Sequence, residues 1–301
     1  MRGLGMLALG ASAAVADPVT VDQGPNWTTA TRTEFYSQDQ GSQMMPLSWL
    51  KALKQSGGKP FLAGSLGRYG YLPNPASPTP GLPVGFTVNG TGASTMVGMT
   101  CAACHTRQIE AGGSAYRIDG GPAIVDFQSM LQDLDTSVGG VLADDTAFRR
   151  FAVSVLGPKP TKDAKAALKS ALQLWFLRYD TLMKLALPTP PWGPARLDAV
   201  SMIFNRLSGL DLGPAPSFLI PGNIHQAAAP VRYPFLWNAA IQDHTQWPGF
   251  ANNGDAILSL ARNLGEVFGV FATFQPTKSW YGTDFLDNNS ADFPAFSSLA
   301  A

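Results

Sequence analysis

Five consecutive residues constrain this chain most: Cys101, Ala102, Ala103, Cys104 and His105. They hold both cysteines of the 301-residue sequence and one of its three histidines. C-x-x-C-H is the attachment signature of c-type haem, in which two thiols form thioethers with the haem and the adjacent histidine binds the iron. The sequence therefore predicts one covalently bound haem c, held by Cys101 and Cys104, with His105 as iron ligand.

Three alternative roles for the two cysteines compete with haem attachment. A thioredoxin-like redox pair needs a βαβ context, which the flanking residues 98–100 and 106–108 do not supply. A structural zinc site needs four ligands, and without a second C-x-x-C pair the others would have to be His225, His244 or carboxylates. A structural disulfide suits an oxidising compartment, but it leaves the position of His105 unexplained.

The composition indicates a loop-rich globular protein with balanced charge. The chain is 45% hydrophobic and 14% charged, and its 21 basic and 21 acidic side chains give a formal net charge of zero. This balance argues against a nucleic-acid partner and against an electrostatically held membrane surface. The length is enough for one large or two small domains, and 31 glycines and 24 prolines predict many irregular connections.

The N-terminus is typical of an export signal. Arg2 is the only charged side chain among residues 1–16, and residues 4–15 are apolar or small. An A-x-A cleavage site at 14–16 predicts that the signal peptide is residues 1–16 and that the mature chain starts at Asp17. No other segment reaches the ~18 apolar residues of a transmembrane helix. We therefore expect a periplasmic or secreted bacterial protein without a transmembrane segment.

Apolar periodicity predicts a mainly α fold with long irregular Pro/Gly-rich loops and few short strands. Capping residues, prolines and glycines predict helices after Pro46, from Pro122 to Gly139-Gly140, after Asp144 or Asp145, from Thr161 to about Leu187, over 195–208 and after Asp255. Residues 17–44 are expected to form an extended arm. Residues 58–95 are expected to be a long loop that ends in a short strand at 86–88.

Several stretches resemble a known family. They are residues 83–88, 97–106, 117–123, 229–237, 246–249 and 262–267. The first three look like the N-terminal haem domain of the di-haem cytochrome c peroxidase superfamily, and the whole set is most similar to its rubber-oxygenase branch. The resemblance covers about residues 80–272. It implies a cytochrome c-type haem domain and a haem-dependent oxidoreductase of peroxidase or oxygenase type, which activates peroxide or dioxygen.

The sequence departs from that family in its number of haem motifs. The superfamily carries two c-type haems on one chain, whereas this sequence has one C-x-x-C-H motif. We expect residues 17–274 to form a cytochrome c-like haem domain with helical insertions and residues 275–301 to begin a missing C-terminal region. A second haem is expected only if the chain is a fragment. The alternative is a mono-haem electron-transfer protein without its own catalysis.

The resemblance also implies catalytic residues. Trp247 is the preferred candidate for an electron relay, ahead of Trp237, and Gln246 lies beside it. His244 and His225 are both candidates for the group on the open side of the iron. For each of these side chains the alternative is a purely structural role, as a buried aromatic anchor or a hydrogen-bonded histidine.

Two arginines are candidates for contact with the haem propionates. Arg117 and Arg262 are cofactor-binding residues in this interpretation, and an ion pair between Arg262 and Glu266, four residues apart on a helix, is the alternative. Phe268 and Phe271 could line the haem pocket or form an ordinary helix face. The methionines at 96, 99, 130, 183 and 202 are predicted to pack in the core. The expected partner is a small redox protein or a small-molecule oxidant.

Overall fold

The C-x-x-C-H motif joins two small β-sheets in the computed structural model, which describes residues 17–246, 249 and 251–294. In the first sheet β4 lies between β2 and β3 and is antiparallel to both. In the second sheet β6 is antiparallel to β5 and parallel to β1. The one-turn helix α3 connects β4 to β5. The bounds are β1 (Val19–Thr20), β2 (Met45–Pro46), β3 (Phe86–Asn89), β4 (Met96–Met99), α3 (Cys101–Cys104), β5 (Thr106–Ala111) and β6 (Ser114–Asp119).

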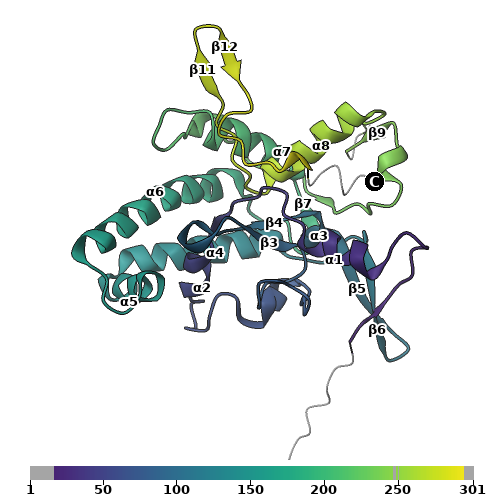
Figure 1. Cartoon of the computed structure of the whole chain (residues 1–301), viewed down its shortest axis with the longest axis horizontal. Helices are drawn as coiled ribbons and strands as arrows, with labels where there is room; N and C mark the ends of the chain where they lie inside the picture. Colours follow the sequence, from purple (N-terminus) through teal and green to yellow (C-terminus); the bar gives the residue numbers. More distant parts are fainter. Residues whose placement is uncertain (1–16, 247–248, 250, 295–301) are drawn as a thin grey trace, which may run out of the picture.

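A group of four helices packs beside the first sheet and contributes a large part of the main apolar core (Figure 1). Helix α4 contacts both α5 and α6, and α2 contacts α5. Each of these four helices buries an apolar stripe, for example Leu131, Leu134 and Val138 of α4. The bounds are α2 (Leu47–Ala52), α4 (Phe127–Ala143), α5 (Asp145–Leu156) and α6 (Lys162–Ala186).

A second helical group lies on the other side of α6. Helix α7 packs against α8, and the π-helical turn η3 that continues α7 contacts α6. The remaining described strands pair into two-stranded sheets. The bounds are α7 (Ala199–Phe204), η3 (Asn205–Leu210), β7 (Arg196–Leu197), β8 (Val231–Arg232), β9 (His244–Thr245), β10 (Ala251–Asn252), α8 (Ala256–Gly269), β11 (Thr277–Ser279) and β12 (Gly282–Asp284).

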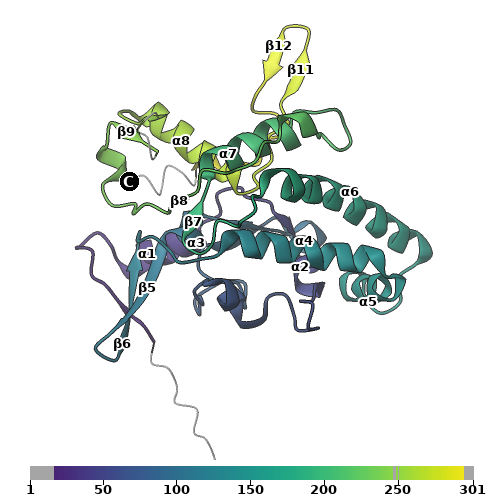
Figure 2. The same cartoon turned by 180° about the vertical axis from the view of Figure 1, so that it is seen from behind.

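The β11–β12 hairpin projects from the molecule in both views (Figures 1 and 2). Its tip carries Trp280, which is 93% exposed, and Tyr281, which is 78% exposed. This hairpin lies in the segment for which the sequence shows no strong pattern. The short 3₁₀ turns of the chain are η1 (Ala63–Tyr69), η2 (Gly92–Ser94), η4 (Pro221–Asn223) and η5 (Ala239–Ile241).

The expectation of a mainly α, cytochrome c-type fold is wrong. The described chain is a mixed α/β structure in which short strands form five small sheets. The expected extended arm is also only partly correct, because it contains helix α1 (Thr29–Ser37), capped by the side chain of Thr28. The physical reason is that strands of two to six residues carry too short a pattern to be recognised before their partners are known.

Other predicted elements are confirmed. Helix α5 is capped by Asp144, α6 by Thr161 and α8 by Asp255, and each cap accepts a backbone hydrogen bond as predicted. The short strand at 86–88 is β3, and residues 58–95 are otherwise largely irregular. The predicted helix starting at Pro122 begins only at Phe127, and it continues past the glycine pair that was expected to end it.

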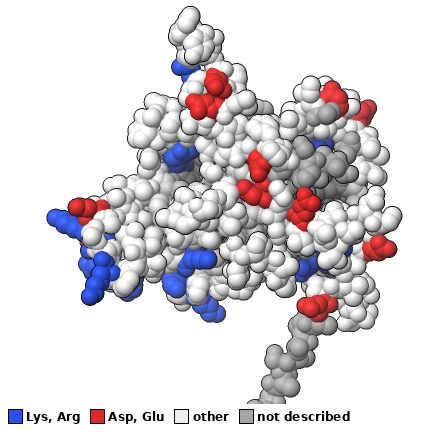
Figure 3. Space-filling model, in the orientation of Figure 1, with Lys and Arg blue, Asp and Glu red and all other residues white. Residues whose placement is uncertain are grey.

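Charged side chains are unevenly distributed over the face drawn in Figure 3. Basic side chains gather over the end of the molecule where α5 and α6 meet, whereas acidic ones lie mainly over the other half. The exposed basic residues in the α5–α6 region include Arg149, Arg150, Lys159 and Lys162. Within the described part of the chain, no helix combines the length and the apolar character needed to cross a membrane.

Candidate cofactor-attachment site

Helix α3 is fixed tightly against the first sheet. Ala102 and Ala103 are 1% and 4% exposed, so the two alanines of the motif face the protein. Gly85 has φ +75° and lies so close that a Cβ there would be 2.0 Å from the backbone nitrogen of Ala103. Only glycine tolerates both the positive φ and this approach. The cysteines are three residues apart, so they share the opposite face of the turn.

Both thiols are free and half-buried. Burial raises the pKa of Cys101, and burial together with the charge of Cys101 raises the pKa of Cys104 to about 12. A thioredoxin-like pair needs the opposite shift, because its attacking cysteine must be a thiolate near neutral pH. The structure thus offers neither a disulfide nor an activated dithiol at this position.

His105 is oriented by a residue far away in sequence. Its Nδ1 lies 2.9 Å from the carbonyl oxygen of Pro234. Because a carbonyl can only accept, Nδ1 carries the proton and Nε2 keeps its lone pair, which is the tautomer a metal ion binds. Burial lowers the pKa of His105 to about 4, so the imidazole is neutral at physiological pH. The ring of Tyr233 stands edge-on to the imidazole, with centroids 6.3 Å apart.

The segment that supplies Pro234 is fastened at both ends. Before it, β8 pairs with β7. After it, the backbone nitrogen of Leu236 donates to the carbonyl of Gly120 at 2.9 Å. Trp237 then donates from Nε1 to Gln23 Oε1 and to the carbonyl of Asp119. These anchors hold Pro234 in place. Trp237, the less favoured relay candidate, is partly exposed, and its ring centroid lies 5.6 Å from that of Phe235.

Polar side chains of α8 and the loop before it lie within electrostatic reach of the two thiols. The charge of Glu266 contributes to the raised pKa of both Cys101 and Cys104. Glu266 accepts a 2.8 Å hydrogen bond from Nε2 of Gln246. Burial raises the pKa of Glu266, while Gln246 and Arg262 lower it. The net rise makes this carboxyl easier to protonate than a solvated glutamate.

Arg262 does not form the ion pair with Glu266 that was the alternative to a cofactor-binding role. Its guanidinium instead donates to the side-chain oxygens of Asn253 and Asn263. Arg262 and Gln246 both line a cavity of about 280 Å³ between α7 and α8, whose other walls are mostly apolar. The structure thus brings two of the predicted site residues, Gln246 and Arg262, to the wall of one cavity, and the charge of Arg262 also acts on Cys101.

Other candidates lie elsewhere. His244 is exposed, with Nδ1 3.4 Å from the carboxylate of Asp243, and His225 is exposed on a loop. Arg117 is buried, but its guanidinium donates to the carbonyl of Pro73 and to Gln108. Trp247 lies outside the described residues.

The apolar candidates take structural positions. Phe271 stacks on Tyr179, and Phe268 packs against Phe274. The predicted core packing of the methionines is confirmed for Met99, Met130, Met183 and Met202, which are buried; Met96 is half-buried.

Three residues that contribute to this site belong to no sequence motif. Pro234 acts through its carbonyl, which every residue has. Tyr233 lies beside His105 and its hydroxyl contacts Cys104. Gln40 accepts a weak hydrogen bond from the Cys101 thiol at 3.6 Å. The only sequence signal was indirect, since residues 233 and 234 fall in a stretch that resembles the haem family.

The described residues contain no group of three or more His, Cys, Asp or Glu side chains arranged to hold a metal ion. The alternative of a structural zinc site therefore finds no ligand set in that part of the chain. The residues that could hold a cofactor are the two thiols, through covalent bonds, and Nε2 of His105.

Comparison with known proteins adds one relative. The chain is 33% identical over 282 residues to an uncharacterized protein, y4iJ, of Sinorhizobium fredii, which corresponds to 84% of this chain and 45% of the relative. The chain thus spans less than half the length of this relative. No family model matches the chain. No solved structure matches it either.

Proposed function

We propose that this chain is an exported c-type haem protein that works as an oxidoreductase of peroxidase or oxygenase type. The hydrogen bond between Nδ1 of His105 and the carbonyl of Pro234 carries the proposal. It leaves Nε2 without the proton, and the two cysteines of the preceding turn form no disulfide. A histidine held by a carbonyl in this way is the usual support for a metal-binding imidazole.

The residues present fit a covalently attached haem. Cys101 and Cys104 would form the two thioethers, and His105 would bind the iron through Nε2. When bound, the haem supplies a redox-active iron that exchanges electrons with peroxide or dioxygen. Pro234 fixes the tautomer and orientation of His105, and the ring of Tyr233 limits its movement.

The polar cluster near the thiols favours catalysis over simple electron transfer. Glu266 could hold or release a proton at its carboxyl, because burial raises its pKa towards the working pH. Gln246 holds this carboxylate through a 2.8 Å hydrogen bond. Gln246 also lines the cavity between α7 and α8, whose other walls are mostly apolar.

The alternative function, a mono-haem electron carrier, needs a second axial ligand such as methionine or histidine. Met99, Met130 and Met202 are buried in the apolar core, and His225 and His244 are exposed. Exposure of both histidines favours the enzyme, whereas burial of the methionines does not separate the two functions. The sequence resemblance to the di-haem cytochrome c peroxidase superfamily, and to its rubber-oxygenase branch, supports the same proposal.

The test is production of the chain with its leader in a bacterial host that carries the c-haem maturation machinery. We expect the reduced pyridine adduct to give one haem c per chain. The double variant Cys101→Ala/Cys104→Ala should lose the covalent haem, whereas His244→Ala, a matched change at an exposed histidine, should keep it. A colourless wild-type protein would overturn the proposal. A purely low-spin spectrum of Met/His type would select the electron carrier instead.

A further inference from the structure

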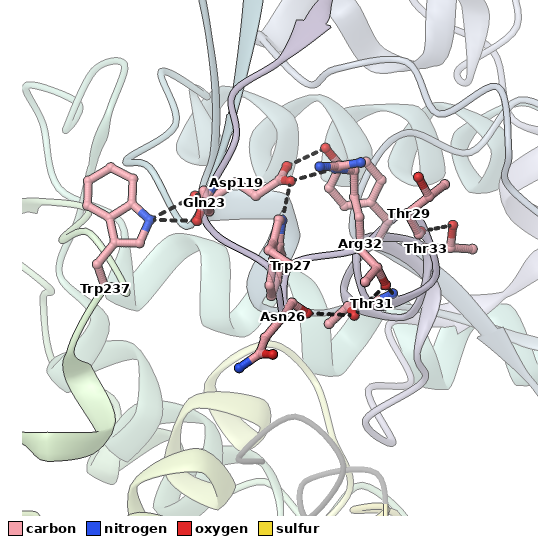
Figure 4. Close-up of polar contacts among 11 residues, drawn as sticks. Gln23, Asn26, Trp27, Thr29, Thr31, Arg32, Thr33, Asp119 and Trp237 are labelled. Carbon is pink, nitrogen blue, oxygen red and sulfur yellow. Dashed lines mark hydrogen bonds and ion pairs between the residues drawn. The ribbon is translucent and has the colours of Figure 1, made fainter.

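A fully buried carboxylate lies behind the C-x-x-C-H motif. Asp119, at the end of β6, is 0% exposed and accepts three side-chain hydrogen bonds. Its Oδ2 accepts from Nε1 of Trp27 and from Nε of Arg32, both at 2.8 Å (Figure 4). Its Oδ1 accepts from the phenol of Tyr36. Arg32 balances the charge of the carboxylate, and the two aromatic donors fill acceptor sites that burial hides from water.

Tyr36 connects this carboxylate to the motif. Helix α1, which carries Tyr36, packs against α3. The Tyr36 ring belongs to one apolar cluster with Ala102, against which Cys101 packs. The carbonyl of Tyr36 also accepts a hydrogen bond from the backbone nitrogen of Gly85, the residue that touches α3 most closely. Tyr36 therefore belongs to the packing that supports α3, the helix that carries the predicted attachment points of the haem.

Aromatic rings continue from Tyr36 to the surface. The Phe35 ring lies 6.0 Å from Tyr36 and 5.5 Å from Trp27, centroid to centroid. Trp27 is half-buried between the exposed residues Asn26 and Thr28. The indole therefore meets solvent at one edge and the Asp119 carboxylate at its Nε1. The path from solvent towards the motif thus consists of the neighbouring rings of Trp27, Phe35 and Tyr36. Trp27 and Tyr36 both donate to the Asp119 carboxylate.

We propose that Tyr36 and Trp27 form an electron relay, with Asp119 as the proton acceptor of Tyr36, through which a small one-electron reductant in solution supplies electrons to the haem. The inference rests on the proposed function and adds to it a surface site where reducing substrate is oxidised. Such a site serves small reductants that have no access to the iron.

The electrons and protons that the relay transfers balance over one catalytic cycle. One hydrogen peroxide, two protons and two electrons give two molecules of water. For each electron, Tyr36 gives one electron inward and its phenolic proton moves to Oδ1 of Asp119, which leaves a neutral tyrosyl radical and a protonated carboxyl. Trp27 then passes on one electron from the reductant, and the proton returns from Asp119 to the phenol. Two reductant molecules are each oxidised by one electron.

The surroundings of Tyr36 suit this coupled step. Burial, followed by the hydrogen bond to Asp119, raises the pKa of the phenol, so it does not lose its proton before oxidation. A direct hydrogen bond to a carboxylate provides the acceptor at the moment of oxidation. Arg32 remains paired with the other carboxylate oxygen and keeps the acceptor in place.

The first experiment looks for the radical itself. Haem-loaded protein is mixed with one equivalent of hydrogen peroxide without reductant, frozen and studied by electron paramagnetic resonance. We expect a tyrosyl signal that narrows when the protein contains ring-deuterated tyrosine and that falls at least ten-fold in Tyr36→Phe. Tyr69→Phe is the matched control, because Tyr69 also donates to a carboxylate, Asp133, at 2.6 Å but belongs to a different apolar cluster. It should keep the signal.

The outcomes separate the two proposals. A wild-type protein that binds haem and consumes peroxide without a tyrosyl radical, or an equal signal in Tyr36→Phe, would overturn the relay and leave the haem function intact. Lack of covalent haem would overturn both. Should Tyr36→Phe fail to fold, Trp27→Phe gives a second test. There the radical should form but decay at least ten-fold more slowly on mixing with ascorbate, and an unchanged decay would refute the relay.

Discussion

Asp119 shows how one residue can join segments far apart in the chain. Its carboxylate binds the N-terminal segment and α1, and its backbone carbonyl accepts from Gln23 and Trp237 (Figure 4). Its nearest partner along the sequence among these is 83 residues away. Both oxygens of the carboxylate accept side-chain hydrogen bonds, two at Oδ2 and one at Oδ1. Its neutralisation must therefore leave donors unsatisfied.

We expect Asp119→Asn to lower the free energy of unfolding by about 2–4 kcal/mol, because breaking a buried pair leaves Arg32 without a counter-charge. The figure is below the range for fully buried pairs, since the Arg32 side chain is 19% exposed. Urea denaturation followed by circular dichroism measures it. Asp145→Asn is the control, because Asp145 is 82% exposed and pairs with Lys169 at the surface. It should cost less than about 1 kcal/mol. Equal losses in the two variants would contradict the importance of the buried network.

At the scale of helices, the sequence predicted those ends that depend on local chemistry. The caps of α5, α6 and α8 are side chains that bond to a backbone nitrogen within their own first turn. Such contacts require no tertiary partner. For this reason three helix starts could be read from single residues.

The end of α4 could not be predicted, because its cause lies on another helix. The predicted stop at Gly139-Gly140 is inside α4. A Cβ at Gly139 would lie 3.2 Å from the ring of Phe176 on α6. Glycine therefore serves the close approach of two helices at this point and not chain reversal.

In the candidate site, too, residues of a local motif could be predicted, whereas residues that reach the site through tertiary contacts could not. Cys101, Cys104 and His105 could be identified because they form one contiguous motif. The support of His105 comes from Pro234, 129 residues further on, and through a backbone atom. Glu266, whose charge acts on both thiols, was predicted only as an ion-pair partner of Arg262. A single sequence holds no signal for contacts of this kind.

Packing of α4 against α6 predicts a stability that depends on pH. Asp135 of α4 is half-buried, and its pKa is raised from 3.8 to about 6 by burial and then by the charge of Asp180 on α6. The folded protein binds this proton more tightly than the unfolded chain. Its stabilising contribution is therefore complete below about pH 4 and is lost as the pH rises to about 6.

Asp135→Asn should consequently stabilise the protein at neutral pH. We expect a gain of about 1 kcal/mol at pH 7, after allowance for solvent screening at a half-exposed site, and almost no change at about pH 4. Urea midpoints at both pH values measure this. The control is Asp163→Asn in the first turn of α6, where loss of a favourable charge at the helix N-terminus should cost about 0.3–1 kcal/mol. A gain that is equal at both pH values would refute the titration of Asp135.

At the scale of the whole molecule, residues 40–43 hold together parts from both ends of the chain. Ser42 donates to the carbonyl of Val270 and accepts from the backbone nitrogen of Met99. Ser290 donates from its hydroxyl to the carbonyl of Gly41 at 2.7 Å. Gln40 reaches Cys101 from the same segment. The segment thus links the first sheet, the motif and the chain beyond α8.

This link predicts a large effect of Gly41→Ala, with Gly24→Ala as a matched control. Both glycines have a positive φ, +92° at Gly41 and +99° at Gly24, so alanine is strained at either position by about 1–3 kcal/mol. A Cβ at Gly41 would also lie 1.9 Å from the carbonyl oxygen of Ser290, whereas a Cβ at Gly24 meets nothing within 4 Å. Displacing the Ser290 segment should add about 1–3 kcal/mol to the loss, the usual cost of overpacking.

Urea denaturation measures the loss of stability in both variants. The backbone amide of Ser290 donates to the carbonyl of Thr273. Its hydrogen exchange shows whether the additional loss in Gly41→Ala arises in this segment. We expect faster exchange at Ser290 in Gly41→Ala and wild-type exchange there in Gly24→Ala. Because residue 40 adjoins Gly41 and contacts the Cys101 thiol, Gly41→Ala should also lower the yield of covalent haem. Equal stability losses in the two variants would mean that the segment after α8 can move away from Gly41 at no cost, and that residues 40–43 do not bind the two ends of the chain together.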